Sequence, residues 1–163
     1  MPLPPPSLKG RALRLLSGHE YSRKELERKL KTHEPEPGML SKALDELQAK
    51  GFINEQRVVD SVIHRRSAKL GAARIKNELQ SKGLDPGAVK EAVSSLQATE
   101  LERARAIWSK KFGASLPAPA LSKAASAAER GKQMRFLASR GFGADTIRRV
   151  VACEEDDQDR PLG

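Results

Sequence analysis

Adjacent basic residues recur along the chain, at Arg65-Arg66, Lys110-Lys111 and Arg148-Arg149. A guanidinium group suits carboxylates and phosphates because its planar donor fork matches two oxygen atoms, and an ammonium group adds a compact positive charge. Side chains of this kind bind anions and do not themselves break or form bonds. The chemistry that the sequence suggests first is therefore recognition of a phosphate-rich or acidic partner.

The charge of the whole chain points the same way. Its 163 residues carry 30 Lys and Arg against 21 Asp and Glu, a formal net charge of +9. Five of the acids lie in the final stretch EEDDQDR (Glu154 to Arg160), which holds one base. Residues 1–153 therefore carry 29 bases against 16 acids, a net +13. Such an excess favours a polyanionic partner, although a soluble basic protein with no such partner is the simpler alternative.

Residues that could perform catalysis or hold a metal are not grouped. His19, His33 and His64 are scattered, and none has another His or a Cys at a ligand spacing. Cys153 is the only cysteine, and it lies beside acids that disfavour a thiolate. There is no Gly-rich phosphate loop. We therefore expect no enzyme activity, no metal and no cofactor.

The beginning of the chain, MPLPPPSLKG, has no apolar segment of the kind that a secretory signal needs. No apolar run approaches the ~20 residues that span a bilayer. A single cysteine excludes a disulfide framework within the chain and fits a reducing compartment. We predict a cytoplasmic monomer that does not enter membranes.

Apolar spacing and capping residues predict helices almost throughout, and no strand. Ser22 with Glu25 has the spacing of a capping box, and so does Thr99 with Glu102. Asn54 and Asp85 are further N-caps. The predicted helices cover 8–18, 23–33, 39–50, 55–70, 72–82, 86–98, 100–112, a segment ending near 140, and 144–152.

These nine helices form three similar groups of three. A shift of 49 residues places Leu26, Leu30 and Leu40 on Ile75, Leu79 and Val89. A shift of 58 places LQSKGLDPGAVKEAV (79–93) on LASRGFGADTIRRVV (137–151), with the glycine terminator and the apolar positions in register. Fixed-period similarity of this kind predicts tandem repeats, and stacking them gives an elongated, curved array.

The predicted organisation has five parts. A disordered, Pro-rich N-terminus (1–7) precedes repeat 1 (8–53) and repeat 2 (54–98). Repeat 3 (99–153) contains a Pro-rich loop at 113–120, and an acidic, disordered tail (154–163) follows.

Basic residues on the outer faces of the later helices are the candidate binding site. On the second helix, acids such as Glu25 are spaced to neutralise bases such as Lys29, so a solvated face explains that charge equally well. On the fourth and ninth predicted helices the acids are fewer, which favours binding. The candidates are Arg57, Arg65, Arg66, Lys69, Arg74, Lys76, Lys110, Lys111, Arg135, Arg140, Arg148 and Arg149.

Five segments, taken in order, resemble the RecX family of bacterial regulators. They are ALRLLSGHEYSRKELERKL (12–30), GFINEQRVV (51–59), KLGAARIKNELQSKGL (69–84), KKF (110–112) and FLASRGFGADTIRRVV (136–151). The resemblance covers most of residues 8–152. It implies tandem three-helix repeats and, as partner, the filament that the RecA recombinase forms on single-stranded DNA.

The resemblance further implies binding in the groove of that filament. The implied effects are inhibition or tuning of ATP hydrolysis, strand exchange, coprotease activity and filament growth in recombination, DNA repair and the SOS response. A helical module that binds single-stranded or duplex DNA independently of recombinase is the alternative. A protein scaffold with no role at nucleic acid is a third.

Overall fold

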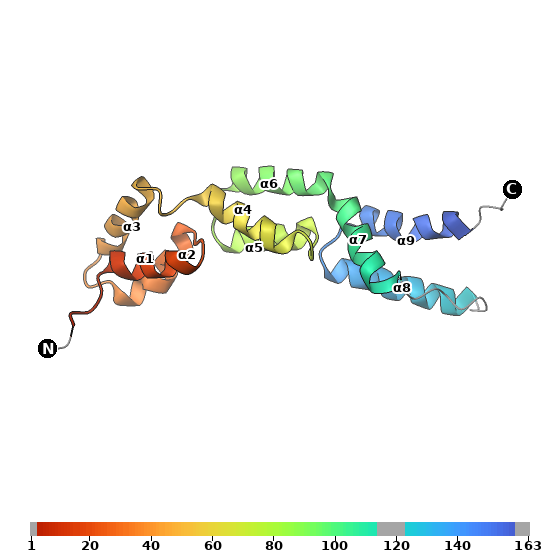
Figure 1. Ribbon diagram of the computed structural model, residues 1–163, viewed down its shortest axis with the longest axis horizontal. Helices are drawn as coiled ribbons and strands as arrows, with labels where there is room; N and C mark the ends of the chain where they lie inside the picture. Colours follow the sequence, from red (N-terminus) through yellow and green to blue (C-terminus); the bar gives the residue numbers. More distant parts are fainter. Residues whose placement is uncertain (1–2, 114–122, 159–163) are drawn as a thin grey trace. The chain divides into compact units, whose positions relative to one another are not determined.

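Residues 3–113 and 123–158 are described by a computed structural model of the chain (Figure 1). All regular structure in this part is helical, which confirms the all-α prediction. The short 3-10 helix η1 (Lys31–His33) follows the second of the nine α-helices that these residues form. The α-helices are α1 (Leu8–Gly18), α2 (Arg23–Leu30), α3 (Met39–Ala49), α4 (Glu55–Arg66), α5 (Ala72–Ser81), α6 (Pro86–Ala98), α7 (Glu100–Phe112), α8 (Lys123–Ser139) and α9 (Ala144–Gln158).

The chain divides into two compact units. The N-terminal unit comprises residues 1–62 and 78–89, and the C-terminal unit comprises residues 63–77 and 90–163. The division passes through α4, α5 and α6. Each unit therefore contains one complete three-helix group and part of the middle group.

In the N-terminal unit, α1, α2 and α3 pack against one another (Figure 1). Leu26 and Leu44 are fully buried at the centre of this core. Burying an aliphatic side chain of this size contributes about 1.5–3 kcal/mol. The other buried members are Ala12, Leu30, Leu40, Leu47 and Ile53.

In the C-terminal unit, α7, α8 and α9 make the equivalent group. Its core is richer in aromatic rings, because Trp108, Phe112 and Phe142 are all buried. The indole Nε1 of Trp108 donates a hydrogen bond to Gln133 Oε1 at 3.0 Å, so the buried polar atom is satisfied. Ala104, Leu137, Ile147, Val150 and Val151 complete the core.

The repeated positions are buried as the repeat requires. Leu79 and Leu137 are both fully buried, and Val89 and Ile147 are 3% and 5% exposed. Gly83 and Gly141, the repeated terminators, have φ angles of 68° and 90°. A side chain strains the left-handed backbone, so glycine is required at both turns.

Three of the predicted helix caps are confirmed. Ser22 and Glu25 form a complete capping box at α2, with the Glu25 amide 3.2 Å from Ser22 Oγ. Asn54 Oδ1 accepts from the Arg57 amide at the start of α4. Asp85 Oδ2 accepts from the Ala88 amide at the start of α6. Short polar side chains thus set these helix starts from local sequence alone.

The predicted capping box at Thr99 is wrong. Thr99 has φ −109° and ψ 3°, away from the extended conformation of an N-cap, and its side chain makes no cap hydrogen bond. Its hydroxyl instead donates to the Leu96 carbonyl at 3.3 Å and accepts from Arg103 Nε at 3.1 Å. The hydroxyl is therefore used to connect α6 with α7.

Two predicted helix ends are also wrong. α4 ends at Arg66 rather than near Gly71, so Lys69 lies in the following turn and not on the helix. The carbonyls of Ser67 and Leu70 in this turn accept from Arg103 instead of continuing the helix. α9 continues to Gln158 rather than ending near Ala152, because no Gly or Pro interrupts it.

Several predicted features fall outside the described part of the chain. The Pro-rich loop at 113–120 lies there apart from Gly113, as do residues 159–163 of the acidic tail and residues 1–2. The side chains of Cys153 and of the acids from Glu154 onward are likewise outside it.

Candidate anion-binding interface

Each unit contains a place where the turn between two helices of one group docks on the first turns of a helix from another group. In the N-terminal unit the α5–α6 turn, Ser81 to Gly83, docks on α2; we call this the first joint. Ser22 Oγ donates to the Lys82 carbonyl at 2.5 Å. Arg28 Nη2 donates to the Ser81 carbonyl at 2.9 Å. Side chains of α2 therefore hold the backbone of the turn.

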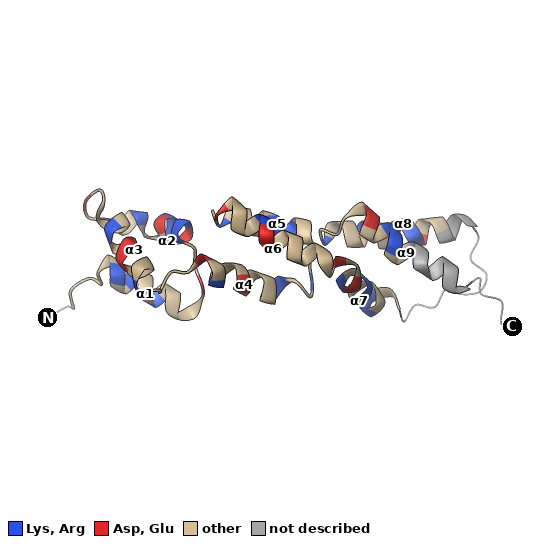
Figure 2. Ribbon diagram, turned by 90° about the horizontal axis from the view of Figure 1, so that it is seen from above, with Lys and Arg blue, Asp and Glu red and all other residues tan. Residues whose placement is uncertain are grey.

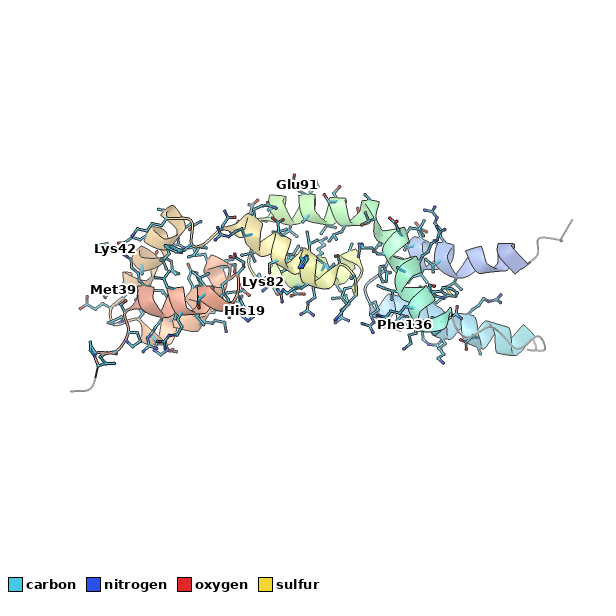
Figure 3. All side chains as sticks on the ribbon, in the orientation of Figure 1. His19, Met39, Lys42, Lys82, Glu91 and Phe136 are labelled. Carbon is cyan, nitrogen blue, oxygen red and sulfur yellow. The ribbon has the colours of Figure 1, made fainter. Side chains whose placement is uncertain are left out.

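An ion pair completes the first joint. Lys82 Nζ lies 2.7 Å from Glu25 Oε1, with side chains only 15% and 16% exposed. Burial acts to raise the pKa of the Glu25 carboxyl, but the hydrogen bonds from Lys82 and the Ser22 amide outweigh it, so the pKa is lowered overall. Figure 3 marks Lys82 at this joint. The charge of Lys82 is thus neutralised within the fold.

The second joint lies in the C-terminal unit, where the α8–α9 turn, Ser139 to Gly141, docks on the start of α5. Here the contacts run between backbones. The Gly71 amide donates to the Arg140 carbonyl at 2.7 Å, and the Ala73 amide donates to the Gly141 carbonyl at 3.3 Å. Arg74 Nη1 adds a hydrogen bond to the Ser139 carbonyl at 3.0 Å. A Cβ at Gly71 would clash with the Gly141 backbone, so only glycine permits this approach.

The side chain of Arg140 is left outside these contacts, and it stacks on a ring. Its guanidinium carbon lies 5.1 Å from the centroid of Phe136, and Lys111 Nζ lies 4.6 Å from the same centroid. We call Lys111, Phe136 and Arg140 the Phe136 cluster. Phe136, labelled in Figure 3, also meets Phe112 edge to face at 5.4 Å. The ring thus holds two cations in place by cation–π attraction.

No carboxylate neutralises Arg140 among the described residues. By the two sequence offsets, Arg140 corresponds to Lys82, and the position equivalent to Glu25 is occupied by Arg74. The acid of the first joint has therefore become a base in the second. The guanidinium of Arg74 donates to the carbonyl of Ser139, the residue before Arg140. Arg74 and the Phe136 cluster together are the candidate interface.

Of the twelve candidates from the sequence, eleven lie in the C-terminal unit. The structure brings Arg74, Lys111 and Arg140 to the second joint. Lys110 and Arg135 are exposed immediately before Lys111 and Phe136 in the sequence. In Figure 2 the ribbons of α5, α7 and α8 are blue where Lys and Arg lie.

The other candidates lie elsewhere. Arg57, the one in the N-terminal unit, is committed to the fold: its Nε donates to Glu20 Oε1 at 3.0 Å and its Nη2 to the Gly51 carbonyl at 2.8 Å. Arg148 pairs with Asp145 on α9, and Arg149 is exposed beside it. Arg65, Arg66, Lys69 and Lys76 are exposed at the end of α4, in the next turn and on α5.

Arg103 is the structural arginine that the sequence did not single out. Its Nη1 donates to the carbonyls of Ser67 and Leu70 at 2.9 and 2.8 Å, and its Nη2 to Leu96 at 2.9 Å. Burial lowers its pKa, and the nearby Glu100 opposes that effect only in part. Nothing in the sequence separates Arg103 from the other bases of α7, because its partners are backbone carbonyls.

Comparison with known proteins identifies the chain's relatives. It is 45% identical over 153 residues to the Regulatory protein RecX of Leptothrix cholodnii, covering 94% of this chain and 92% of the relative. It is 40% identical to the Regulatory protein RecX of Herminiimonas arsenicoxydans, over 94% and 96% of the two chains. The chain belongs to the RecX family.

Two RecX family models match separate parts of the chain. The model of the first three-helix domain matches residues 9–47, and that of the third three-helix domain matches residues 98–151. A crystal structure of RecX from Lactobacillus salivarius superposes with a TM-score of 0.71, at 21% identity, over 91% of this chain and 94% of that one. At this identity the likeness establishes the three-helix fold. Lys111, Phe136 and Arg140 all lie within the third RecX domain.

Two further observations bear on the chemistry of this RecX chain. Among the described residues, no three His, Cys, Asp or Glu side chains are grouped so that they could hold a metal ion. None of the described helices is long and apolar enough to cross a membrane.

Proposed function

We propose that this protein regulates a RecA-type recombinase by binding the filament that the recombinase forms on DNA. Membership of a family whose curated relatives are named regulatory proteins supports a regulatory role. In this proposal the protein acts by binding and catalyses no reaction. Through it the protein slows ATP hydrolysis, strand exchange and coprotease activity, and limits filament growth.

The observation that supports binding most directly is the second joint. It presents two cations fixed on the Phe136 ring, beside Arg74. Cations held in place before binding lose less conformational entropy when a phosphate or carboxylate arrives. A recombinase filament on DNA offers both groups. We propose that Arg74 and the Phe136 cluster contact this filament.

The test is the DNA-dependent ATPase activity of the cognate recombinase, measured with and without the full-length protein at physiological salt. We expect the rate to fall as the protein approaches equimolar ratio with recombinase. An unchanged rate at equimolar protein contradicts the proposal.

A helical module that acts on DNA alone is the second candidate, because the same cations suit naked phosphates. Electrophoretic mobility of a labelled oligonucleotide without recombinase separates the two. The recombinase-dependent role is supported if affinity for naked DNA falls steeply between low and physiological salt while the protein still binds recombinase filaments. Binding and activity that need no recombinase support the alternative.

A further inference from the structure

A pocket in the N-terminal unit gathers basic groups that belong to none of the predicted sites. It lies between α1, the end of α2 and η1, and its volume is about 330 Å³. Two arginines of α1, Arg11 and Arg14, line it together with Lys29 of α2 and His33 of η1. Pro6, Leu15 and Leu30 form its apolar wall.

These four basic groups converge without a counter-ion. No Asp or Glu of the described residues lines the pocket. Arg11, Arg14 and His33 form no ion pair within the described part of the chain. The ammonium of Lys29 lies 5.5 Å from the centroid of the Tyr21 ring.

Other basic residues of the same unit form ion pairs with acids. Arg23 pairs with Asp45 at 2.6 Å and with Glu27 at 3.1 Å, Lys9 pairs with Glu46, and Arg57 pairs with Glu20. Like charges placed close together on helices repel one another, so three cations on one pocket, with no acid among its lining residues, favour the arrival of an anion. Since these other bases are paired, a general excess of surface charge does not explain why the bases of the pocket lack an acid beside them.

The volume and the lining residues of the pocket narrow the class of ligand that it could bind. Small-molecule sites occupy about 300–1,000 Å³, and this volume suits one compact ligand better than an extended acidic peptide. A terminal phosphate carries about −1.5 to −2 charges and three acceptor oxygens, which matches two guanidinium forks and an ammonium. The apolar wall of Leu15 and Leu30 offers a surface for a sugar or a base.

We propose that this pocket binds the phosphate of a nucleotide, either free or at the end of a DNA strand. Arg11 and Arg14 hold the phosphate oxygens, Lys29 adds charge, and His33 lines the same pocket. The proposal concerns residues of the first RecX domain and does not depend on the recombinase. It stands or falls separately from the proposed function, because its test contains no recombinase.

The test is isothermal titration of the full-length protein with ADP and with pyrophosphate, at low and at physiological salt. A labelled oligonucleotide with a 5′-phosphate, compared with the same oligonucleotide without it, distinguishes a free nucleotide from a strand end. The test variant is Arg11→Gln/Arg14→Gln. The control is Lys42→Gln/Lys50→Gln, which removes the same charge from exposed positions of this unit that do not line the pocket. Circular dichroism verifies that both variants fold.

We expect saturable binding that weakens by at least about tenfold in the arginine variant, since two charge-assisted hydrogen-bonding groups are lost. The lysine control should bind as the wild type does. Arg11→Lys/Arg14→Lys should retain part of the affinity, because charge remains but the donor fork does not. Absence of saturable binding at millimolar ligand overturns the proposal, and so does equal weakening in the control, which indicates diffuse charge only.

Discussion

The turns Ser81–Gly83 and Ser139–Gly141 have nearly the same sequence, SKG and SRG, and each docks on the start of a helix from another repeat. They are held by different means. The first joint uses side chains: the Ser22 hydroxyl, the Arg28 guanidinium and the Lys82–Glu25 ion pair. The second joint adds backbone hydrogen bonds from Gly71 and Ala73 to the turn, and one arginine side chain, Arg74, donates to the Ser139 carbonyl as Arg28 does to Ser81 in the first.

The difference shows how a repeat can keep its scaffold and change its surface. Where the first joint neutralises Lys82 with Glu25, the second has Arg140 on Phe136 and Arg74 in place of the acid. Because backbone hydrogen bonds carry much of the second joint, the side chains of Lys111 and Arg140 are available for another role. We therefore expect the first joint to be chiefly structural and the second to carry the partner contact.

The largest expected effect concerns the residue that follows each turn. Phe142 and Leu84 are 5% and 6% exposed. We expect Phe142→Ala to lower the free energy of unfolding by about 3–5 kcal/mol, and Leu84→Ala by about 2–4 kcal/mol, because each leaves a cavity. Urea denaturation followed by circular dichroism measures both. An effect below about 1 kcal/mol for Phe142 contradicts its place in the core.

The second expected effect concerns backbone contact. Gly71→Ala forces a Cβ against the Gly141 backbone, so it should destabilise the C-terminal unit by about 2–3 kcal/mol. Gly18→Ala is the matched control, since a Cβ there meets nothing within 4 Å. The control should be neutral or slightly stabilising, because alanine favours helix. Hydrogen exchange of the α5 amides reports the change locally, and equal exchange in both variants contradicts a backbone-held joint.

The third effect is a dependence on pH that belongs to the first joint. The pKa of Glu25 is lowered in the fold from its ordinary value of 4.5, so its ion pair stabilises the protein above that pH. This contribution is lost as the pH falls below 4.5 and through the lowered pKa. In Lys82→Met, stability at pH 7 should fall by about 1–2 kcal/mol, a value between those of exposed and buried pairs.

The pH profile of unfolding distinguishes this from a simple packing change. Between pH 6 and pH 3 the wild type should lose more stability than Lys82→Met does, since the variant lacks the cation that lowers the Glu25 pKa. Parallel profiles for the two proteins contradict a stabilising role for the pair.

The smallest expected effect on stability comes from a substitution that gives the second joint a carboxylate at Arg74, the position that corresponds to Glu25 in the first joint. Arg74→Glu places a carboxylate near Arg140, as Glu25 lies near Lys82. We expect the free energy of unfolding to fall by about 1 kcal/mol, since the hydrogen bond from Arg74 to the Ser139 carbonyl is lost and the new surface pair contributes little. Inhibition of the recombinase ATPase should nevertheless weaken. Full inhibition by this variant contradicts a role for the second joint in binding.

The parts of the fold that could be predicted from sequence are those set by near neighbours. Ser22, Asn54 and Asp85 cap their helices because a short polar side chain reaches an amide two or three residues away. The repeated apolar positions were also found, since each must face a core. The tandem three-helix organisation followed from these.

The joints could not be predicted, because apart from the Glu25 carboxylate their acceptors are backbone carbonyls, which every residue carries. Nothing in the sequence distinguishes Arg28 and Arg74, which bind the carbonyls of Ser81 and Ser139, from bases that face solvent. The local pattern at Thr99 was also misleading, because its hydroxyl bonds to Arg103 and to the Leu96 carbonyl and caps no amide of α7. The sequence predicted Arg74, Lys111 and Arg140 as candidates, but it gave no sign that the Phe136 ring lies against two of them.

The most direct test of the central claim is binding of the protein to recombinase filaments on single-stranded DNA, measured by co-sedimentation at physiological salt. Lys111→Gln/Arg140→Gln removes the two cations from Phe136 and leaves the Arg140 carbonyl in the joint. Lys42→Gln/Lys50→Gln removes the same charge from the N-terminal unit. We predict that the first variant binds at least about tenfold more weakly than the wild type, while the second binds as the wild type does. Equal binding by both variants contradicts the assignment of the partner contact to the second joint.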